Sequence, residues 1–226
     1  MNKLSICKAA VIVAMGVLLQ GCGTTYSGAG IRARVIDAET KQAIPGVIVV
    51  AHWQLVYPLP IHGTGSRDVE LLEAVTDAQG WFQFPAWRSK ALPEGVPLYA
   101  RMSGSSPALY FFRSGYTEIL TNDSDRPSSG SVVTSQWDGK TIELERFVGS
   151  RLSYASTVGG LLTRLNYRED CYWKKMPQMV IAMDQEAKQL NAEDITHYIR
   201  TLGDWEAIGE GSNCGSLQNF LREYKK

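Results

Sequence analysis

Between residues 31 and 147, short apolar stretches alternate with links rich in glycine, proline and polar residues. Ile31, Ala33 and Val35 alternate with arginines, and the run 47–50 is apolar and β-branched throughout. Successive side chains of a strand point to opposite faces, so these patterns indicate strands, the continuous run being a buried one. We expect strands at 31–35, 47–50, 74–76, 81–84, 98–102, 109–113 and 141–147. Short strands without intervening helices predict a mainly β chain folded as a β-sandwich.

The link 77–80 lies between two of these apolar stretches and contains Asp77 and Gly80. Aspartate favours turns because its side chain accepts hydrogen bonds from nearby backbone amides, and glycine allows a positive φ. The spacing therefore predicts a hairpin turn. A calcium loop needs several alternating oxygen ligands and a distant glutamate, whereas this link offers one carboxylate, so we expect no metal here.

Several short segments of this region resemble a known family. They are Val35-Ile36-Asp37, Thr40, Ile44-Pro45-Gly46-Val47, Thr76 to Phe82, and Ser114-Gly115-Tyr116. In this order they look like the carboxypeptidase regulatory-like domain, over roughly residues 31–147. The resemblance implies a transthyretin-like/Ig-like β-sandwich. The matching segments are turns and strand starts, so the resemblance carries no catalytic residue into this chain.

Three links are longer than such a module requires, namely 54–72, 85–97 and 122–137. Long loops held by a rigid sandwich are a common place for binding residues. An exposed aromatic patch would suit a protein partner. The candidate partner-binding residues are Trp53, Tyr57, Tyr110 and Phe111.

The N-terminal segment contains Lys3 and Lys8, an apolar run at 9–19, and the sequence Leu19-Gln20-Gly21-Cys22. A charged start, a short apolar run and a small residue before a cleavage point are typical of a signal peptide. The run is too short to cross a bilayer, which needs about 20 residues. The last four residues resemble the lipobox of bacterial lipoproteins, whose cysteine is diacylated and becomes the new N-terminus. An ordinary secretory peptide and a buried helix are the alternatives.

The lipoprotein resemblance implies a signal peptide at 1–21, followed at 22–30 by the lipidated Cys22 and a flexible tether of small residues. Gly23, rather than aspartate, follows the cysteine, and by the same resemblance this favours the outer membrane. We expect the protein to face the periplasm, with the cell surface as the alternative. A multiply acylated cysteine gives stable attachment, so the membrane itself is an expected partner through the lipid anchor.

Residues 148–226 show apolar residues at helical spacing instead of alternation. A stripe of this kind predicts amphipathic helices. The expected helices start near Pro177, Ile195 and Leu217, and a further one lies between Ser150 and Leu165.

Two cysteines of this helical region, Cys171 and Cys214, are expected to form a disulfide. Cys7 leaves with the signal peptide and Cys22 carries lipid, so these two remain as a pair in an oxidising compartment. A zinc site and two free thiols are the alternatives.

Composition limits the classes of function. The chain has a formal net charge of zero and no basic run, which excludes the clustered lysines and arginines of a nucleic-acid-binding protein. None of its three histidines belongs to an HExxH motif, and we expect neither a cofactor nor catalytic residues. The sequence favours a non-enzymatic envelope lipoprotein that binds another envelope protein or strengthens an assembly. A hydrolase or inhibitor that acts on peptide or glycan through the long loops is the alternative.

Overall fold

The computed structural model describes residues 25–61, 63–103, 107–117, 119–121, 132–164, 173–193 and 217–224. The strands are β1 (Thr25–Gly28), β2 (Ile31–Asp37), β3 (Ile48–Pro58), β4 (Thr64–Val75), β5 (Trp81–Phe84), β6 (Trp87–Ala91), β7 (Arg101–Met102), β8 (Ala108–Phe112), β9 (Ile119–Thr121), β10 (Val132–Val133) and β11 (Thr141–Leu144). The helices are α2 (Arg151–Arg164), α3 (Pro177–Gln189) and α5 (Leu217–Tyr224). Cys22, Cys171, Cys214 and the helix expected from Ile195 lie outside the described residues.

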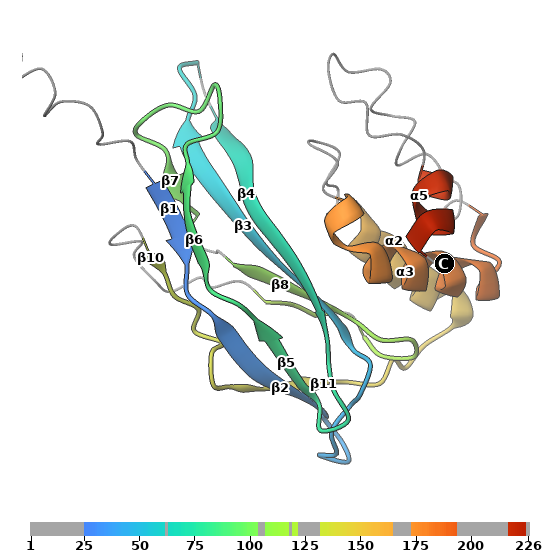
Figure 1. Cartoon of the computed structure of the whole chain (residues 1–226). Helices are drawn as coiled ribbons and strands as arrows, with labels where there is room; N and C mark the ends of the chain where they lie inside the picture. The colour runs from blue at the N-terminus through green and yellow to red at the C-terminus, as the bar shows by residue number, and fades with distance from the viewer. Residues whose placement is uncertain are drawn as a thin grey trace, which may run out of the picture.

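The strands form three sheets. The first has the order β10-β1-β6, the second β11-β2-β5, and the third β4-β3-β8-β9 with β7 beside β3. The first two sheets follow one another along one layer, and the third packs against them as the other layer (Figure 1). The expected mainly β fold, a sandwich followed by a helical region, is therefore confirmed.

Aromatic side chains from both layers meet in the inner core of the sandwich. The ring of Phe82 meets those of Phe84 and Phe111 edge to face, at centroid distances of 5.6 and 5.9 Å. Trp53 meets Trp87 in the same way at 5.7 Å. Each ring removes a large apolar area from water, so the two pairs that cross between the layers, Phe82–Phe111 and Trp53–Trp87, contribute much of the attraction between them. Smaller buried residues around them include Ile31, Ala33, Val35, Val47, Val49, Ala51, Leu55, Leu109, Ile142 and Leu144.

Strand β3 is covered on both of its faces. Val49 and Ala51 lie in the inner core, whereas Ile48 and Val50 belong to a second core on the opposite face of the same sheet. This explains why residues 47–50 carry no polar side chain: no face of this part of β3 meets water. The prediction of a buried strand here is confirmed.

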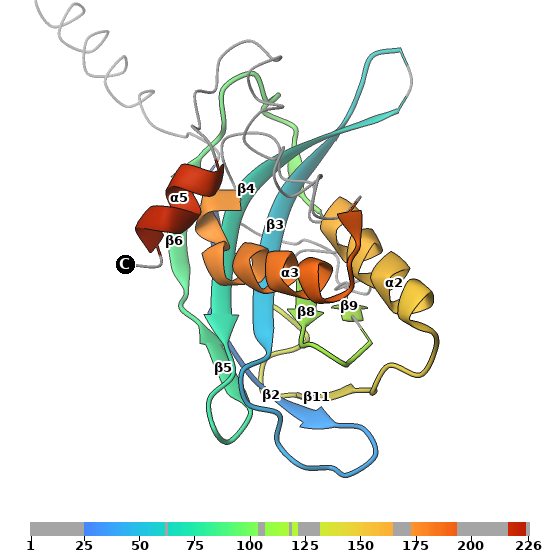
Figure 2. The same ribbon diagram turned by 90° about the vertical axis from the view of Figure 1, so that its right-hand side faces the viewer.

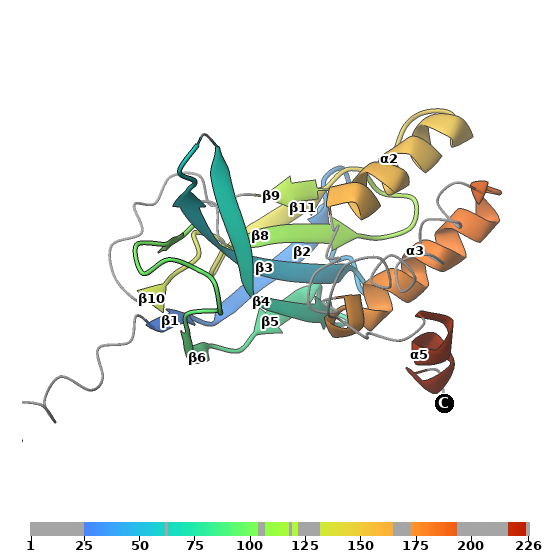
Figure 3. The ribbon, with the colours of Figure 1, turned by 90° about the horizontal axis from the view of Figure 1, so that it is seen from above.

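The helical layer covers the outer face of the third sheet, as Figures 2 and 3 show. Trp173, just before α3, meets Phe220 of α5 edge to face at 5.1 Å. Tyr154 of α2 lies 4.9 Å from the ring of Phe147. The other buried members of this second core are Leu71, Tyr110 and Phe112 from the sheet and Val158, Leu161, Met176, Met179, Val180, Met183 and Ala187 from the helical layer.

A side chain of the sheet caps the start of α3. The helix begins at Pro177, whose fixed φ suits a first turn, but Met176 before it provides no side-chain cap. The carboxylate of Glu73 on β4 accepts hydrogen bonds from the backbone amides of Gln178 and Met179, at 3.1 and 2.7 Å. Burial raises the pKa of Glu73, and the two amide bonds oppose this rise. The helix and the sheet are thereby joined through amides that would otherwise lack a partner.

The flexible tether expected at 22–30 is wrong for residues 25–28. Thr25–Gly28 form β1, which pairs antiparallel with β6 and parallel with β10. A Cβ on Gly28 would lie 2.2 Å from Nε1 of Trp87, so this small residue allows close packing of the two strands. The small side chains of this segment therefore permit a packed strand, which their composition alone does not distinguish from a flexible tether.

All three long links contain regular structure, the link 122–137 through β10. β3 and β4 stay paired from Ile48 opposite Val75 to Pro58 opposite Thr64, so the link 54–72 consists mostly of the two arms of a long hairpin. The link 85–97 contains β6. β3 contains a bulge between Trp53 and Gln54 and continues to Pro58, well beyond the apolar run expected at 47–50.

Candidate functional site

The exposed aromatic patch predicted from four residues does not form. Trp53 and Phe111 are each 1% exposed and lie in the inner core. Tyr110 is buried on the opposite face beneath the helical layer, and Tyr57 is half-buried. Neighbours in one strand face opposite sides, so Tyr110 and Phe111 cannot share a surface. The prediction was wrong because β3 and β8 are central strands of the third sheet, which is covered on both faces.

The link 77–80 is a turn, as expected. Oδ1 of Asp77 accepts hydrogen bonds from the backbone amides of Gln79 and Trp81, both at 2.9 Å. The amide of Gly80 donates to the carbonyl of Asp77 at 2.9 Å, and Gly80 has a φ of +78°. The prediction that this turn joins two paired strands in a hairpin was wrong, however. β4 pairs with β3 and β5 pairs with β2, so this turn carries the chain from the third sheet to the second.

Gly80 also lies directly against strand β2. Its carbonyl accepts a hydrogen bond from the amide of Val35 at 2.8 Å. A Cβ on Gly80 would lie 2.4 Å from the carbonyl oxygen of Val35. Both the positive φ and this backbone contact require glycine at position 80.

Asp37 at the end of β2 connects several of the segments that carry the family resemblance. Its Oδ1 accepts hydrogen bonds from the amides of Glu39 and Thr40 at 3.0 and 2.9 Å. Its Oδ2 accepts one from the hydroxyl of Tyr116 at 2.9 Å and lies 3.1 Å from Nε of Arg146. The bond from the Thr40 amide is the largest influence on the pKa of Asp37, which falls to about 2 despite burial. The carboxylate fixes a turn and joins distant segments, which is a structural role.

This low pKa predicts how stability depends on pH. A carboxyl whose pKa is depressed by folding stabilises the folded state above its unfolded pKa of about 4. That stability is lost as the pH falls towards 2. Asp37→Asn should be less stable than the wild type at pH 6, and the difference between the two should shrink below pH 4. Urea unfolding at several pH values measures this. A difference that stays constant down to pH 2 would contradict the assignment.

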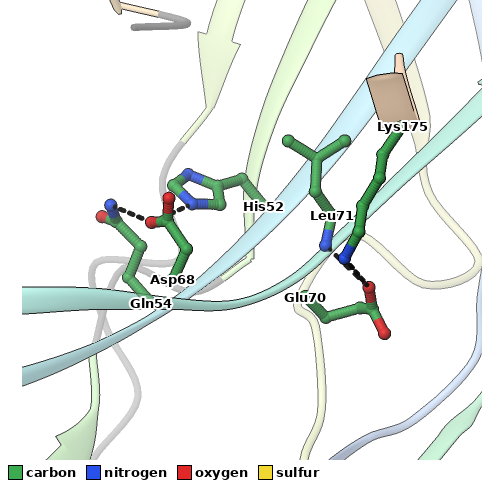
Figure 4. A network of polar contacts seen from close by, with 6 residues as sticks. All are labelled: His52, Gln54, Asp68, Glu70, Leu71 and Lys175. Atoms are coloured by element: carbon green, nitrogen blue, oxygen red, sulfur yellow. Dashed lines mark hydrogen bonds and ion pairs between the residues drawn. The ribbon is translucent and has the colours of Figure 1, made fainter. Parts of the chain in front are cut away.

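A buried polar group lies where the long hairpin meets the helical layer (Figure 4). His52 on β3 lies with Nε2 2.7 Å from Oδ1 of Asp68 on β4, and Nε2 of Gln54 donates to the same oxygen at 2.9 Å. Burial raises the pKa of Asp68, but the hydrogen bond and charge of His52, together with the bond from Gln54, lower it overall. These contacts pair β3 with β4 next to the bulge.

Glu70 forms the second half of this group. Its carboxylate contacts Nζ of Lys90 on β6 and lies 3.2 Å from Nζ of Lys175, just before α3. It also accepts a hydrogen bond from the amide of Leu71 at 3.0 Å. Burial raises the pKa of Glu70, but the Lys90 bond, the Leu71 amide and the charge of Lys175 lower it overall. One carboxylate therefore contacts the first sheet and the helical layer together.

The position of these polar groups decides what they can do. The side chain of His52 is 3% exposed, and its ring faces a carboxylate already shared with Gln54. The group can hold three layers in register, but a substrate would reach His52 only if the layers separated. Within the described ranges, no three histidine, cysteine or acidic side chains are grouped to hold a metal ion. None of the helices that the structure describes is long and apolar enough to cross a bilayer.

Sequence reasoning missed a set of exposed apolar residues at one end of the sandwich. Leu59 and Ile61 lie at the turn between β3 and β4, and Leu98 and Tyr99 lie in the link after β6. We call these four residues the apolar tip. The sequence Pro58-Leu59-Pro60-Ile61 could have indicated these exposed residues. Proline cannot donate to a sheet ladder, so apolar residues placed between prolines are seldom paired strand residues in a core.

Comparisons with known proteins add little to this description. No family model matches the chain, and no curated protein matches it. Among solved structures, the backbone protein of pilus 2b from group B streptococcus is 17% identical, with a TM-score of 0.24 over 56% of this chain and 43% of that one. Chlorocatechol 1,2-dioxygenase from Pseudomonas putida is 14% identical, with a TM-score of 0.25 over 54% and 60%. The C-terminal domain of the shaft pilin spaA from Lactobacillus rhamnosus GG is 11% identical, with a TM-score of 0.21 over 55% and 99%.

Proposed function

We propose that this chain is a non-enzymatic, lipid-anchored protein of the outer membrane, facing the periplasm, that binds or supports another envelope protein. The observation that carries the proposal is the sequence Leu19-Gln20-Gly21-Cys22 after a short apolar run. Cys22 is followed closely by the first strand, which begins at Thr25. A lipid on Cys22 would therefore hold the sandwich beside the membrane, since three residues span at most about 11 Å.

The arrangement of polar side chains supports a non-enzymatic role. His52 and Asp68 contact each other, and Glu70 pairs with Lys175. The carboxylate of Asp37 holds a turn. Each has a structural use that accounts for its burial.

An exposed apolar pair favours a protein partner. Val148 and Leu152 lie where the chain enters α2, and their side chains are largely exposed. Exposed apolar residues in close succession are typical of surfaces that bind proteins. Val148 precedes α2 and Leu152 lies in its first turn, and Figure 1 shows α2 away from β1.

Replacement of Cys22 tests the anchor. Cys22→Ala should abolish incorporation of a fatty-acid analogue and remove the protein from the outer-membrane fraction, because the acylated thiol is gone. Metabolic labelling followed by fractionation measures both. Cys7→Ala is the matched control: this cysteine belongs to the expected signal peptide, so labelling should persist. Unchanged labelling of Cys22→Ala would end the lipoprotein proposal.

A further inference from the structure

The apolar tip is strongly exposed. Ile61 is 83% exposed, Leu98 76%, Tyr99 58% and Leu59 45%. Large aliphatic side chains in two separate loops are thus held out into the solvent together with an aromatic ring. No aspartate, glutamate, lysine or arginine occurs from Pro58 to Ser66. A soluble surface gains nothing from such residues, so they indicate a surface that is covered in use.

The two loops of the apolar tip are joined. The hydroxyl of Tyr99 lies 3.4 Å from the carbonyl oxygen of Pro58 and donates to it. β3 and β4 remain paired up to Pro58 opposite Thr64, which supports the loop that carries Leu59 and Ile61. The apolar tip is therefore presented by a paired hairpin and one adjoining link.

The start of the folded chain lies at the same end of the sandwich. Thr25 pairs with Ala91, the last residue of β6 before the link that carries Leu98 and Tyr99. The hydroxyl of Tyr26 donates to the carbonyl of Ala100, at the end of that link, at 2.7 Å. Figure 1 shows the β3–β4 turn, the link after β6 and the start of β1 at one end of the molecule. The residue three positions before Thr25 is Cys22.

We propose that the apolar tip inserts into the lipid surface that holds the protein, so that the sandwich contacts the membrane through the lipid on Cys22 and through these side chains. This inference rests on the proposed lipid anchor. An anchor within about 11 Å of Thr25 brings this end of the sandwich, rather than the helical layer, against the bilayer. Leucine and isoleucine suit the boundary between headgroups and acyl chains, and tyrosine suits the interface itself.

The proposal makes the orientation of the protein a consequence of two attachments. A lipid on a short chain leaves a protein free to rotate about its anchor. A second contact by Leu59, Ile61 and Leu98 would fix the long axis of the hairpin towards the membrane. The exposed pair near the start of α2 would then remain available to a partner in the periplasm.

A depth measurement on the lipidated full chain tests the proposal. Ile61→Cys is labelled with an environment-sensitive fluorophore and reconstituted in vesicles of phosphatidylethanolamine and phosphatidylglycerol. We expect several-fold weaker quenching by aqueous iodide, and stronger quenching by nitroxide-labelled lipids, than for Val148→Cys treated identically. Val148 is the matched control because it is an apolar residue that is 93% exposed and outside the apolar tip. Wild-type protein carried through the labelling corrects for other thiols.

The outcomes separate the inference from the anchor. Equal iodide quenching at both positions, in protein that still incorporates the fatty-acid analogue, overturns the insertion of the apolar tip and leaves the anchor standing. Protection from iodide without quenching by the nitroxide lipids means that a second copy of the chain covers the apolar tip, and this also overturns the inference. Failure to incorporate the fatty-acid analogue overturns the anchor and the inference together.

Discussion

Gly80→Ala should lower the free energy of unfolding by about 3 kcal/mol. A non-glycine residue in the left-handed region costs about 1–2 kcal/mol. Here the new Cβ would also lie 2.4 Å from the carbonyl oxygen of Val35, a backbone atom that cannot rotate away. Moving the turn away from β2 to make room for this atom adds an overpacking cost of about 1–3 kcal/mol. Urea unfolding followed by tryptophan fluorescence measures the change.

Gly139→Ala separates the two contributions. Gly139 has a φ of +75°, close to that of Gly80, but an added Cβ would meet no atom within 4 Å. This variant should therefore show only the backbone cost of about 1–2 kcal/mol. Equal losses of unfolding free energy in the two variants would show that the contact with Val35 adds nothing to the cost of Gly80→Ala. A calcium-dependent change in melting that Gly80→Ala removes would instead support the ion site that we rejected.

Loss of the expected disulfide between Cys171 and Cys214 should lower the free energy of unfolding by about as much as Gly80→Ala does. Cys171 and Cys214 lie outside the described residues, so their bond remains a prediction. Trp173 and Phe220 meet at 5.1 Å, and each lies a few residues after one of the two cysteines. A bond closing a loop of this length is worth about 4 kcal/mol in the chain-entropy model. Cys214→Ser should lower stability by that order and release α5.

Two measurements check the disulfide. Mass spectrometry of a non-reduced digest should show the two cysteine peptides linked, and reduction should separate them. Proteolysis of Cys214→Ser should begin in the helical region, near α5, while the inner core with Trp53 stays protected. The control is Phe220→Ala, which loses the ring contact but keeps the bond. Two free thiols in protein recovered from the envelope would refute the pairing.

Much of the sandwich could be predicted because its signals are local. The alternation of Ile31, Ala33 and Val35 depends only on neighbouring residues, and β2 forms there. The turn at Asp77 and Gly80 could be read for the same reason, since the bonds of Asp77 reach no further than Trp81. Which strand pairs with which is a long-range property, so the hairpin was assigned wrongly to a turn that connects two sheets.

The errors about binding have a related cause. Trp53 was predicted to belong to an exposed aromatic patch, yet it lies within β3, which continues to Pro58, and its side chain is buried. Residues such as Leu59 and Ile61 were passed over, since exposure depends on what the rest of the fold leaves uncovered. The expected long link 54–72 contains Leu59 and Ile61, but Leu98 and Tyr99 belong to the strand expected at 98–102, of which only Arg101–Met102 form a strand. The sequence could not distinguish the side chains that point inwards from those that remain outside.

The covering of β3 on both faces has a consequence for the order of events during synthesis. The chain leaves the ribosome from its N-terminus, so all residues of the sandwich exist before the helical layer is made. At about 5–20 residues per second, residues 148–226 follow over roughly 4–16 s. During that time the outer face of the third sheet, with Ile48, Val50 and Tyr110, has no cover from its own chain. A sandwich that folded before the last third of the chain was present would therefore leave this apolar face in contact with water.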